Sequence, residues 1–460
     1  MIVSRVARIS AVLALFLICV ACGDTFRPVA VPISPSPPDP SSFHYVLVVS
    51  DNGPSSPGVV SRIDVSGDTN VGEGKTGVGP VHAALLPGGT RVFVANASEG
   101  TLSSFSPNSP TLVTTISLPP NSSGPAVPVF VHTTESANVY VADPGTATAA
   151  GRVLVVSTTS NVVTSVVTVG TNPVALAELP NATKVYAVNQ ADGTVTSINT
   201  VDRTINGTIA TGVSPIWAVA RGDSARVYVL NSGDGTLSAI DTSSDAVLPS
   251  PVSVGAGANY MVYDAKLNRV YVNNPVTNTV TALNVASDPP SVVFTRSVAA
   301  NPISLAALPD GTRVYVASAT CSSGALSSCA ATGGTITTQV TVLNANDGSI
   351  KTTIPMGGVP AVPQCSGARF DVFIAAAAAS SRVYVANCDA GSTAIIRTIP
   401  QPVAGGTAPA DTFVLNVPAP VSAYPPPVPV NGLCPPTQQP ANNGVCQPPP
   451  QNPVFVVPGP

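Results

Sequence analysis

The feature that most constrains the fold of this 460-residue chain is a short phrase that recurs eight times. Its clearest form is RVYVAN, and its copies start at His44, Arg91, Asn138, Lys184, Arg226, Arg269, Arg313 and Arg382. Successive copies are 47, 47, 46, 42, 43, 44 and 69 residues apart. A period in the forties with several short strands per repeat is typical of β-propellers. The spacing therefore predicts an all-β fold, a single propeller of four-stranded antiparallel blades.

One repeat divides into four candidate strands, at residues 172–179, 184–189, 194–199 and 204–212. The first is small and apolar almost throughout, as expected of the innermost strand of a blade. The second and third flank Asp192-Gly193, a hairpin turn in which glycine tolerates positive φ. The same kind of turn recurs at Asp234, Asp310 and Asp347, so we interpret these aspartates as turn-forming.

A basic residue also recurs at one position, immediately before the second strand of most repeats. It is found at Arg91, Arg226, Arg269, Arg313 and Arg382. Recurrence at a fixed repeat position indicates a structural role, such as pairing with a turn carboxylate or carbonyl.

The repeated phrases RVYVAN, DGTVTSIN and LPDGTR resemble the YVTN-type β-propeller repeats of bacterial and archaeal envelope proteins. The resemblance covers roughly residues 44–420 and implies the fold far more than the activity, because this scaffold hosts binding, surface-layer and enzymatic members. The family commonly builds seven blades. Here eight hairpins, with seven convincing inner strands, favour eight blades, one of them completed by a terminal segment. Seven blades, with one terminal hairpin outside the ring, is the alternative.

The first 22 residues have the layout of a secretory signal, with Arg5 and Arg8 followed by an apolar run too short for a comfortable membrane span. The run ends in ICVAC, which resembles a bacterial lipobox and implies cleavage before Cys22 and lipidation of Cys22. Residues 23–43 form a Pro/Ser-rich tether that would act as a semi-rigid spacer. We therefore expect a protein of the bacterial cell envelope, lipid-anchored on the periplasmic or cell-surface face. Ordinary secretion is the alternative.

Six cysteines follow the signal segment as three local pairs: Cys321 with Cys329, Cys365 with Cys388, and Cys434 with Cys446. Six cysteines allow many connectivities, but the middle pair is favoured because its members stand at the adjoining ends of one hairpin. No CxxC spacing occurs among these six, and the only histidines are His44, His82 and His132, so a metal site is disfavoured. We expect structural disulfides. The Pro-rich residues 421–460 would be a stapled segment whose strand-like phrase NPVFVVP could close the ring.

Composition excludes some partners and chemistries. Charged residues are 9% of the chain, against about 25% in an ordinary soluble protein, and no Lys/Arg cluster occurs. We therefore expect no nucleic-acid partner. Phrases typical of hydrolase, metalloprotease or P-loop nucleotide sites (GxSxG, HExxH and Walker) are absent from the sequence, and no metal or cofactor is expected.

Candidate binding residues appear where the inner strands differ. Aligned on their leading residue, the strands carry at the third position His82, Phe130, Ala175, Trp217, Tyr260 and Ser304. Four of these six are aromatic or imidazole in a chain that is only 5% aromatic. Their side chains should lie near one mouth of the axial channel, where an aromatic funnel would suit a sugar, a planar ring or a peptide side chain. The alternative is that they fill gaps between blades.

These features favour an envelope-anchored propeller that acts as a non-catalytic binding or protein-interaction scaffold. Its expected partners are the membrane, through the lipid, and a protein, peptide or glycan. A surface-layer or adhesion component is one alternative. A channel enzyme of the lactonase or quinoprotein kind is another, but it would need charged groups converging on the channel, and the inner strands supply almost none.

Overall fold

A computed structural model describes residues 45–53, 55–65, 68–121, 124–133, 137–145, 150–363, 365, 368–403, 406–418, 439–440, 446–447 and 452–458. The chain divides into two units, residues 1–42 and 43–460, and only the second contains described residues. The expected signal segment with Cys22, the tether, His44 and Cys434 lie outside the described residues. No helix among the described residues is long and apolar enough to cross a membrane.

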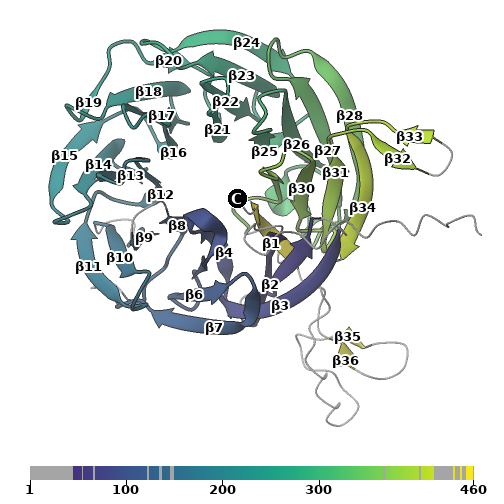
Figure 1. Ribbon diagram of the computed structural model, residues 1–460, viewed down its shortest axis with the longest axis horizontal. Helices are drawn as coiled ribbons and strands as arrows, with labels where there is room; N and C mark the ends of the chain where they lie inside the picture. The colour runs from purple at the N-terminus through teal and green to yellow at the C-terminus, as the bar shows by residue number, and fades with distance from the viewer. Residues whose placement is uncertain are drawn as a thin grey trace, which may run out of the picture. The chain divides into compact units, whose positions relative to one another are not determined.

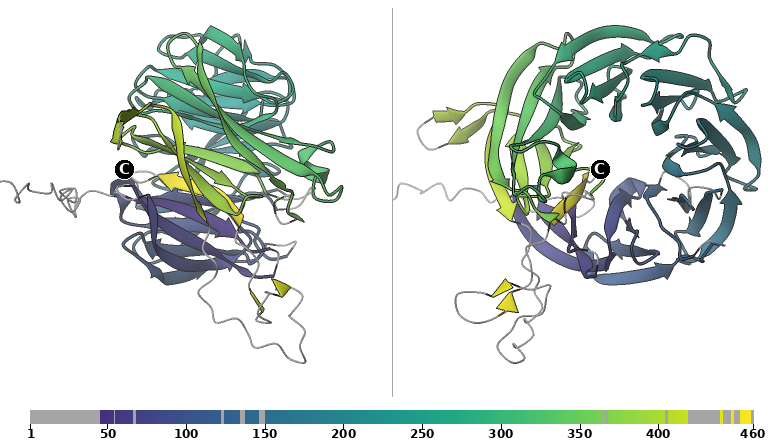
Figure 2. Two further views of the ribbon diagram at one scale, coloured as in Figure 1. Left: turned by 90° about the vertical axis from the view of Figure 1, so that its right-hand side faces the viewer. Right: turned by 180° about the vertical axis from the view of Figure 1, so that it is seen from behind.

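Eight antiparallel blades surround a central axis, as Figure 1 shows from one face and Figure 2 from the side and from behind. The all-β propeller predicted from the repeat is confirmed, with eight blades instead of the seven common in the resembled family. In each blade the first strand lies next to the axis and the last lies on the rim. Blade 5 has its outer strand split into two short segments.

From the axis outward, the blades contain the following strands: blade 1, β37 (Asn452–Pro458), β1 (Tyr45–Asp51), β2 (Pro57–Asp64) and β3 (Thr69–Val78); blade 2, β4 (Pro80–Leu85), β5 (Val92–Asn96), β6 (Thr101–Ser106) and β7 (Ser109–Ser117); blade 3, β8 (Phe130–Thr133), β9 (Asn138–Asp143), β10 (Arg152–Ser157) and β11 (Val163–Thr168); blade 4, β12 (Pro173–Glu178), β13 (Lys184–Asn189), β14 (Thr194–Asn199) and β15 (Ile205–Ala210).

The second half of the ring continues in the same order: blade 5, β16 (Pro215–Ala220), β17 (Arg226–Asn231), β18 (Thr236–Asp241), and β19 (Ala246–Val247) with β20 (Val252–Ser253); blade 6, β21 (Tyr260–Asp264), β22 (Arg269–Asn274), β23 (Thr279–Asn284) and β24 (Ser291–Ser297); blade 7, β25 (Pro302–Ala307), β26 (Arg313–Cys321), β27 (Thr335–Asn344) and β28 (Ile350–Pro360); blade 8, β29 (Val372–Ala376), β30 (Arg382–Asn387), β31 (Ser392–Arg397) and β34 (Thr412–Pro418). Two short hairpins, β32 (Gln401–Val403) with β33 (Gly406–Ala408) and β35 (Gln439–Pro440) with β36 (Cys446–Gln447), and the 3₁₀ turns η1 (Pro87–Gly89) and η2 (Leu326–Ser328) stand outside the blades.

In blades 4 and 5 an Asp-Gly pair closes the hairpin between the two middle strands, whereas Asp310 stands between β25 and β26 and Asp347 between β27 and β28. Gly193 has φ 66°, a conformation that glycine adopts at little cost. The Asp192 carboxylate accepts a hydrogen bond from the Thr171 amide at 2.5 Å, and Asp234 accepts one from the Val213 amide at 3.0 Å. Each aspartate therefore ties its turn to the loop that enters its own blade. The prediction that these residues form turns is confirmed.

The C-terminal strand closes the ring. β37 pairs antiparallel with β1, placing Phe455 opposite Val49 and Val457 opposite Leu47. Blade 1 is therefore built from both ends of the propeller, and β1 has no open inner edge. An uncovered strand edge would offer unpaired backbone groups to other chains, so this pairing both joins the ends and protects β1.

The recurring basic residue bridges neighbouring blades. Lys184 of blade 4 contacts Asp245 in the last turn of blade 5 at 2.7 Å, and the Tyr186 hydroxyl donates to the same carboxylate at 2.6 Å. Arg382 of blade 8 reaches Asp68 of blade 1 at 3.2 Å, where both side chains are buried. The basic residue thus forms an inter-blade clamp, joined in blade 4 by the tyrosine two positions later, which confirms the predicted structural role.

Two of the three expected disulfides are present. Cys321–Cys329 crosslinks the loop at the end of the long β26–β27 hairpin, and Cys365–Cys388 joins the segment before β29 to the end of β30. Both pairings match the local pairs read from the sequence. The third, between Cys434 and Cys446, stays a prediction because Cys434 lies outside the described residues.

Candidate ligand site in the axial channel

The four predicted site residues come together at one level of the axial channel. His82, Phe130, Trp217 and Tyr260 stand at equivalent positions of β4, β8, β16 and β21, and all four side chains are buried. The His82 and Phe130 rings are stacked with centroids 4.0 Å apart. Trp217 lies 5.4 Å from Phe130 and 4.8 Å from Tyr260. Ala175 of blade 4 and Ser304 of blade 7 are the two small residues of the series. They leave room for the rings of the blades on either side to reach one another.

Two further rings complete a closed circle. Phe373 of β29 lies 6.0 Å from Tyr260 and 4.1 Å from Phe455 of β37, and Phe455 lies 4.5 Å from His82. We call these six residues the aromatic ring. Because each member packs against two others, the six side chains form an unbroken layer around the axis, and gap filling and ligand contact are both compatible with it.

The sequence alignment missed Phe373 and Phe455, although a signal for both was present. Pro453, Val454 and Phe455 repeat the Pro-Val-Phe that leads to Phe130, so aligning the C-terminal strand with the other inner strands would have found Phe455. Phe373 stands nine residues before Arg382, the spacing that also separates Trp217 from Arg226, but its strand follows the irregular segment around Cys365 and so escaped the alignment.

That irregular segment brings a charged residue into the channel. Arg369 and Phe370 precede β29 and follow Cys365, whose disulfide to Cys388 ties the segment to blade 8. The Phe370 ring lies 5.4 Å from that of Tyr260 and 6.1 Å from that of Trp217. We call residues 368–371 the channel loop. From the sequence, any charged channel residues were expected on the inner strands. Arg369 lies in the loop before an inner strand, and the inner-strand pattern gives no signal for it.

The Arg369 guanidinium crosses the channel to the opposite blades. It donates a hydrogen bond to the Val174 carbonyl of blade 4 at 2.9 Å, and its Cζ lies 4.9 Å from the Trp217 ring centroid and 5.4 Å from that of Phe130. Contacts of this kind stabilise a cation over an aromatic face. Among the described residues, no carboxylate pairs with Arg369. Burial lowers the pKa of Arg369 to about 10, so the group is still charged at neutral pH.

A cavity of about 400 Å³ lies above the aromatic ring, at the end of the channel where the inner strands begin. Its lining consists of Val81, Val129, Val174, Ile216, Gln190, Asn259, Arg369 and Phe370. Four of these are aliphatic residues at the second position of successive inner strands, which explains why they face the same space. We call this cavity the mouth cavity. It is mostly apolar, with a few polar groups and one cation, as ligand pockets generally are.

A second cavity of about 600 Å³ adjoins the mouth cavity, since Arg369 and Asn259 line both. It lies between the channel loop and the disulfide-linked loop that ends the β26–β27 hairpin, and we call it the side cavity. Its other lining residues include Asn301, Thr320 and Asp371. Burial, with the charge of Asp389 adding to it, raises the pKa of Asp371 to about 6.

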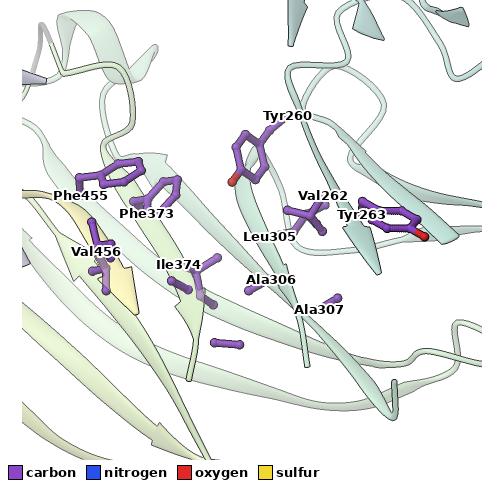
Figure 3. A pocket seen from close by; sticks show the side chains of 13 residues that line it. Tyr260, Val262, Tyr263, Leu305, Ala306, Ala307, Phe373, Ile374, Phe455 and Val456 are labelled. Atoms are coloured by element: carbon purple, nitrogen blue, oxygen red, sulfur yellow. The ribbon is translucent and has the colours of Figure 1, made fainter. Parts of the chain in front are cut away.

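A third cavity, of about 280 Å³, is lined by residues toward the opposite ends of the inner strands. Figure 3 shows it with the rings of Tyr260, Phe373 and Phe455 on one side and the aliphatic side chains of Val262 and Ile374 farther along. Its lining carries no charged side chain. The aromatic ring therefore separates this apolar cavity from the mouth cavity.

Two histidines near the mouth are held neutral. Burial, together with the positive charge of Arg369, keeps the pKa of His82 well below its usual range, and burial lowers the pKa of His132 to about 4. The Val131 amide donates to Nδ1 of His82 at 3.5 Å. Nε2 of His132 is buried and has no hydrogen-bond partner among the described residues. No cluster of three or more His, Cys, Asp or Glu side chains that could hold a metal occurs in the described part of the chain.

Comparison with known proteins adds little to this picture. No protein-family model matches the chain, and no curated protein matches it. Among solved structures, the chain is similar to hydrazine synthase from Kuenenia stuttgartiensis, at 18% sequence identity and a TM-score of 0.49. The match covers 70% of this chain and 96% of that chain. At this level of identity and superposition, the similarity supports no argument about the chemistry of this chain.

Proposed function

We propose that this protein is an exported β-propeller that binds a small apolar anion, such as an aryl or alkyl carboxylate, in the mouth cavity. The observation that carries the proposal is Arg369, a cation in a mostly apolar cavity with no carboxylate partner among the described residues. Burying a charge without a counter-charge is costly, and a bound anion would offset that cost. An arginine also presents several donors in a planar fork that matches a carboxylate.

The rest of the cavity fits the apolar part of such a ligand. Val81, Val129 and Ile216 form an aliphatic wall, and Phe370 offers an aromatic face. Gln190 and Asn259 supply a small number of polar groups that could fix orientation. The cavity favours a small molecule over the protein, peptide or glycan partner that the sequence led us to expect.

We further propose that the propeller is anchored in the bacterial envelope through a lipid on Cys22 and belongs with the YVTN-type repeat proteins. The N-terminal signal pattern and the repeat phrase support these assignments. The two disulfides are in keeping with an oxidising compartment, where such bonds persist. Mass spectrometry of the mature protein should find a lipid-modified N-terminal Cys22, and the Cys22→Ala variant should be released from the membrane fraction. A mature chain cleaved elsewhere would contradict the anchor.

Isothermal titration with 3-phenylpropionate tests the binding function. The wild-type protein should bind this carboxylate, and Arg369→Gln should weaken binding about tenfold or more, because a hydrogen bond to a charged group is lost. Lys266→Gln removes an exposed positive charge outside the three cavities and serves as the matched control, with unchanged affinity expected. Equal affinities for wild type and Arg369→Gln would contradict the proposal.

A further inference from the structure

The side cavity adjoins the proposed ligand site but differs from it in chemistry. Arg369 and Asn259 line both cavities, so a ligand held by Arg369 stands at the boundary between them. The mouth cavity is walled mainly by aliphatic side chains. The side cavity instead contains amide, hydroxyl and carboxylate groups, including Asn301, Thr320 and Asp371. A molecule that fills both would have an apolar body and a polar head.

The side cavity offers acceptors that lack donors. The amide oxygen of Asn259 is buried and has no hydrogen-bond partner among the described residues. In the same part of the chain, Asp371 pairs with no basic side chain, and the nearby Asp389 accepts only the Val362 amide at 2.8 Å. Buried acceptors in native proteins are rarely left unpaired. A group with several N–H donors and a positive charge would satisfy both Asn259 and Asp371.

From this arrangement we infer that the side cavity is a subsite for an ammonium group, and that the ligand is a free α-amino acid with a large apolar side chain. The inference rests on the proposed function, since Arg369 would bind the carboxylate and the mouth cavity the side chain. Asp371 and the Asn259 oxygen would then accept hydrogen bonds from the ammonium group, which carries three donors. The positive Arg369 would face the carboxylate of the amino acid, and the negative Asp371 would face its ammonium group.

Three probes that share a phenyl ring separate the contributions of the two charges. L-Phenylalanine has both the carboxylate and the ammonium, 3-phenylpropionate lacks the ammonium, and phenethylamine lacks the carboxylate. By isothermal titration, the wild-type protein should bind phenylalanine about tenfold or more tightly than either analogue, since each loses one charged hydrogen-bonding group.

Single substitutions test which residues bind the ammonium group of the ligand. Asp371→Asn should weaken phenylalanine binding about tenfold or more while leaving 3-phenylpropionate affinity within about twofold. Asn259→Leu should also weaken phenylalanine more than 3-phenylpropionate, and a thermal melt of each variant should show that it is folded. Asp202→Asn, which removes an exposed turn carboxylate, should change neither affinity.

The outcomes distinguish this inference from the function on which it rests. Binding of 3-phenylpropionate as tightly as phenylalanine, or an unchanged phenylalanine affinity in folded Asp371→Asn, would overturn the amino-acid assignment and leave the anion site in place. Failure of wild-type protein to bind either carboxylate would overturn both proposals.

Discussion

At the scale of single residues, His82 and His132 make the channel sensitive to acid. His132 has a pKa of about 4 in the folded protein, against an ordinary value of 6.5. Between these values the unfolded chain binds a proton that the folded chain does not, so stability falls as pH falls. The neighbouring His82 shifts in the same direction. The pKa of Asp371 is raised in the folded protein, so as pH falls the folded chain binds this proton before the unfolded chain does. Its effect on stability is therefore opposite to that of the histidines.

Comparing wild type with His132→Gln isolates the contribution of one histidine from these opposing effects. Between pH 7 and pH 4.5 the variant should lose about 2 kcal/mol less unfolding free energy than the wild type, since each pKa unit corresponds to about 1.4 kcal/mol. Denaturant unfolding at several pH values measures this difference. Parallel pH profiles for the two proteins would contradict a neutral, buried His132.

At the scale of structural elements, the Cys365–Cys388 disulfide holds the channel loop in place. Without it, the segment carrying Arg369 and Phe370 would depend on ring contacts, on the Arg369 hydrogen bond to Val174 and on the hydrogen bond from the Cys388 amide to the Asp371 carbonyl. The crosslink spans 23 residues, and closing a loop of that length contributes about 3 kcal/mol to stability.

The paired Cys365→Ser and Cys388→Ser substitutions should therefore lower the unfolding free energy by about 3 kcal/mol and weaken binding of 3-phenylpropionate. Denaturant unfolding and isothermal titration measure the two effects. The matched control is the pair Cys321→Ser and Cys329→Ser, whose disulfide does not line the mouth cavity and whose loss should leave that affinity unchanged. Unchanged binding without Cys365–Cys388 would show that the loop needs no crosslink.

The inter-blade clamps should differ in energy according to their burial. Arg382 and Asp68 are 7% and 5% exposed, whereas Arg226 and Asp288 are 17% and 30% exposed. Removing Arg382 leaves the buried Asp68 carboxylate with only the longer contact to Arg397, at 3.8 Å, so Arg382→Met should cost about 3 kcal/mol. Arg226→Met should cost about 1 kcal/mol or less. Denaturant unfolding of both variants checks the ranking, which equal losses would contradict.

The elements of the repeat could be predicted because each recurs in several blades. The Asp-Gly turns and the apolar inner strands are formed within one blade, and the recurring basic residue contacts the next blade, as Lys184 contacts Asp245, so these patterns recur in the sequence. The channel loop does not repeat, and its partner Val174 is 195 residues away. The sequence therefore indicated the position of His82, Phe130, Trp217 and Tyr260 but not the Arg369 that gives the site its charge.

At the scale of the whole molecule, the ring depends on a strand from the far end of the chain. β37 covers β1 and contributes Phe455 to the aromatic ring. Eight repeated hairpins predicted eight blades, and the strand-like phrase NPVFVVP was the segment expected to close the ring. It forms β37, which pairs with β1.

Deleting residues 452–460 should leave β1 with an uncovered edge and open the ring between blades 8 and 1. We expect a protein that aggregates or loses its cooperative unfolding transition, because exposed strand edges pair with other chains. Size-exclusion chromatography and thermal melts measure this. Replacing the β32–β33 hairpin, which stands outside the blades, with a short turn is the control and should preserve a monodisperse, cooperative fold. Normal folding of the truncated chain would contradict ring closure by β37.

The most direct test of the central claim is a crystal structure of the protein with 3-phenylpropionate bound. The account predicts its phenyl ring between Phe370 and the aliphatic wall of the mouth cavity, with its carboxylate on the Arg369 guanidinium. Ligand density at another place on the propeller, or a mouth cavity that stays unoccupied at saturating ligand, would contradict it.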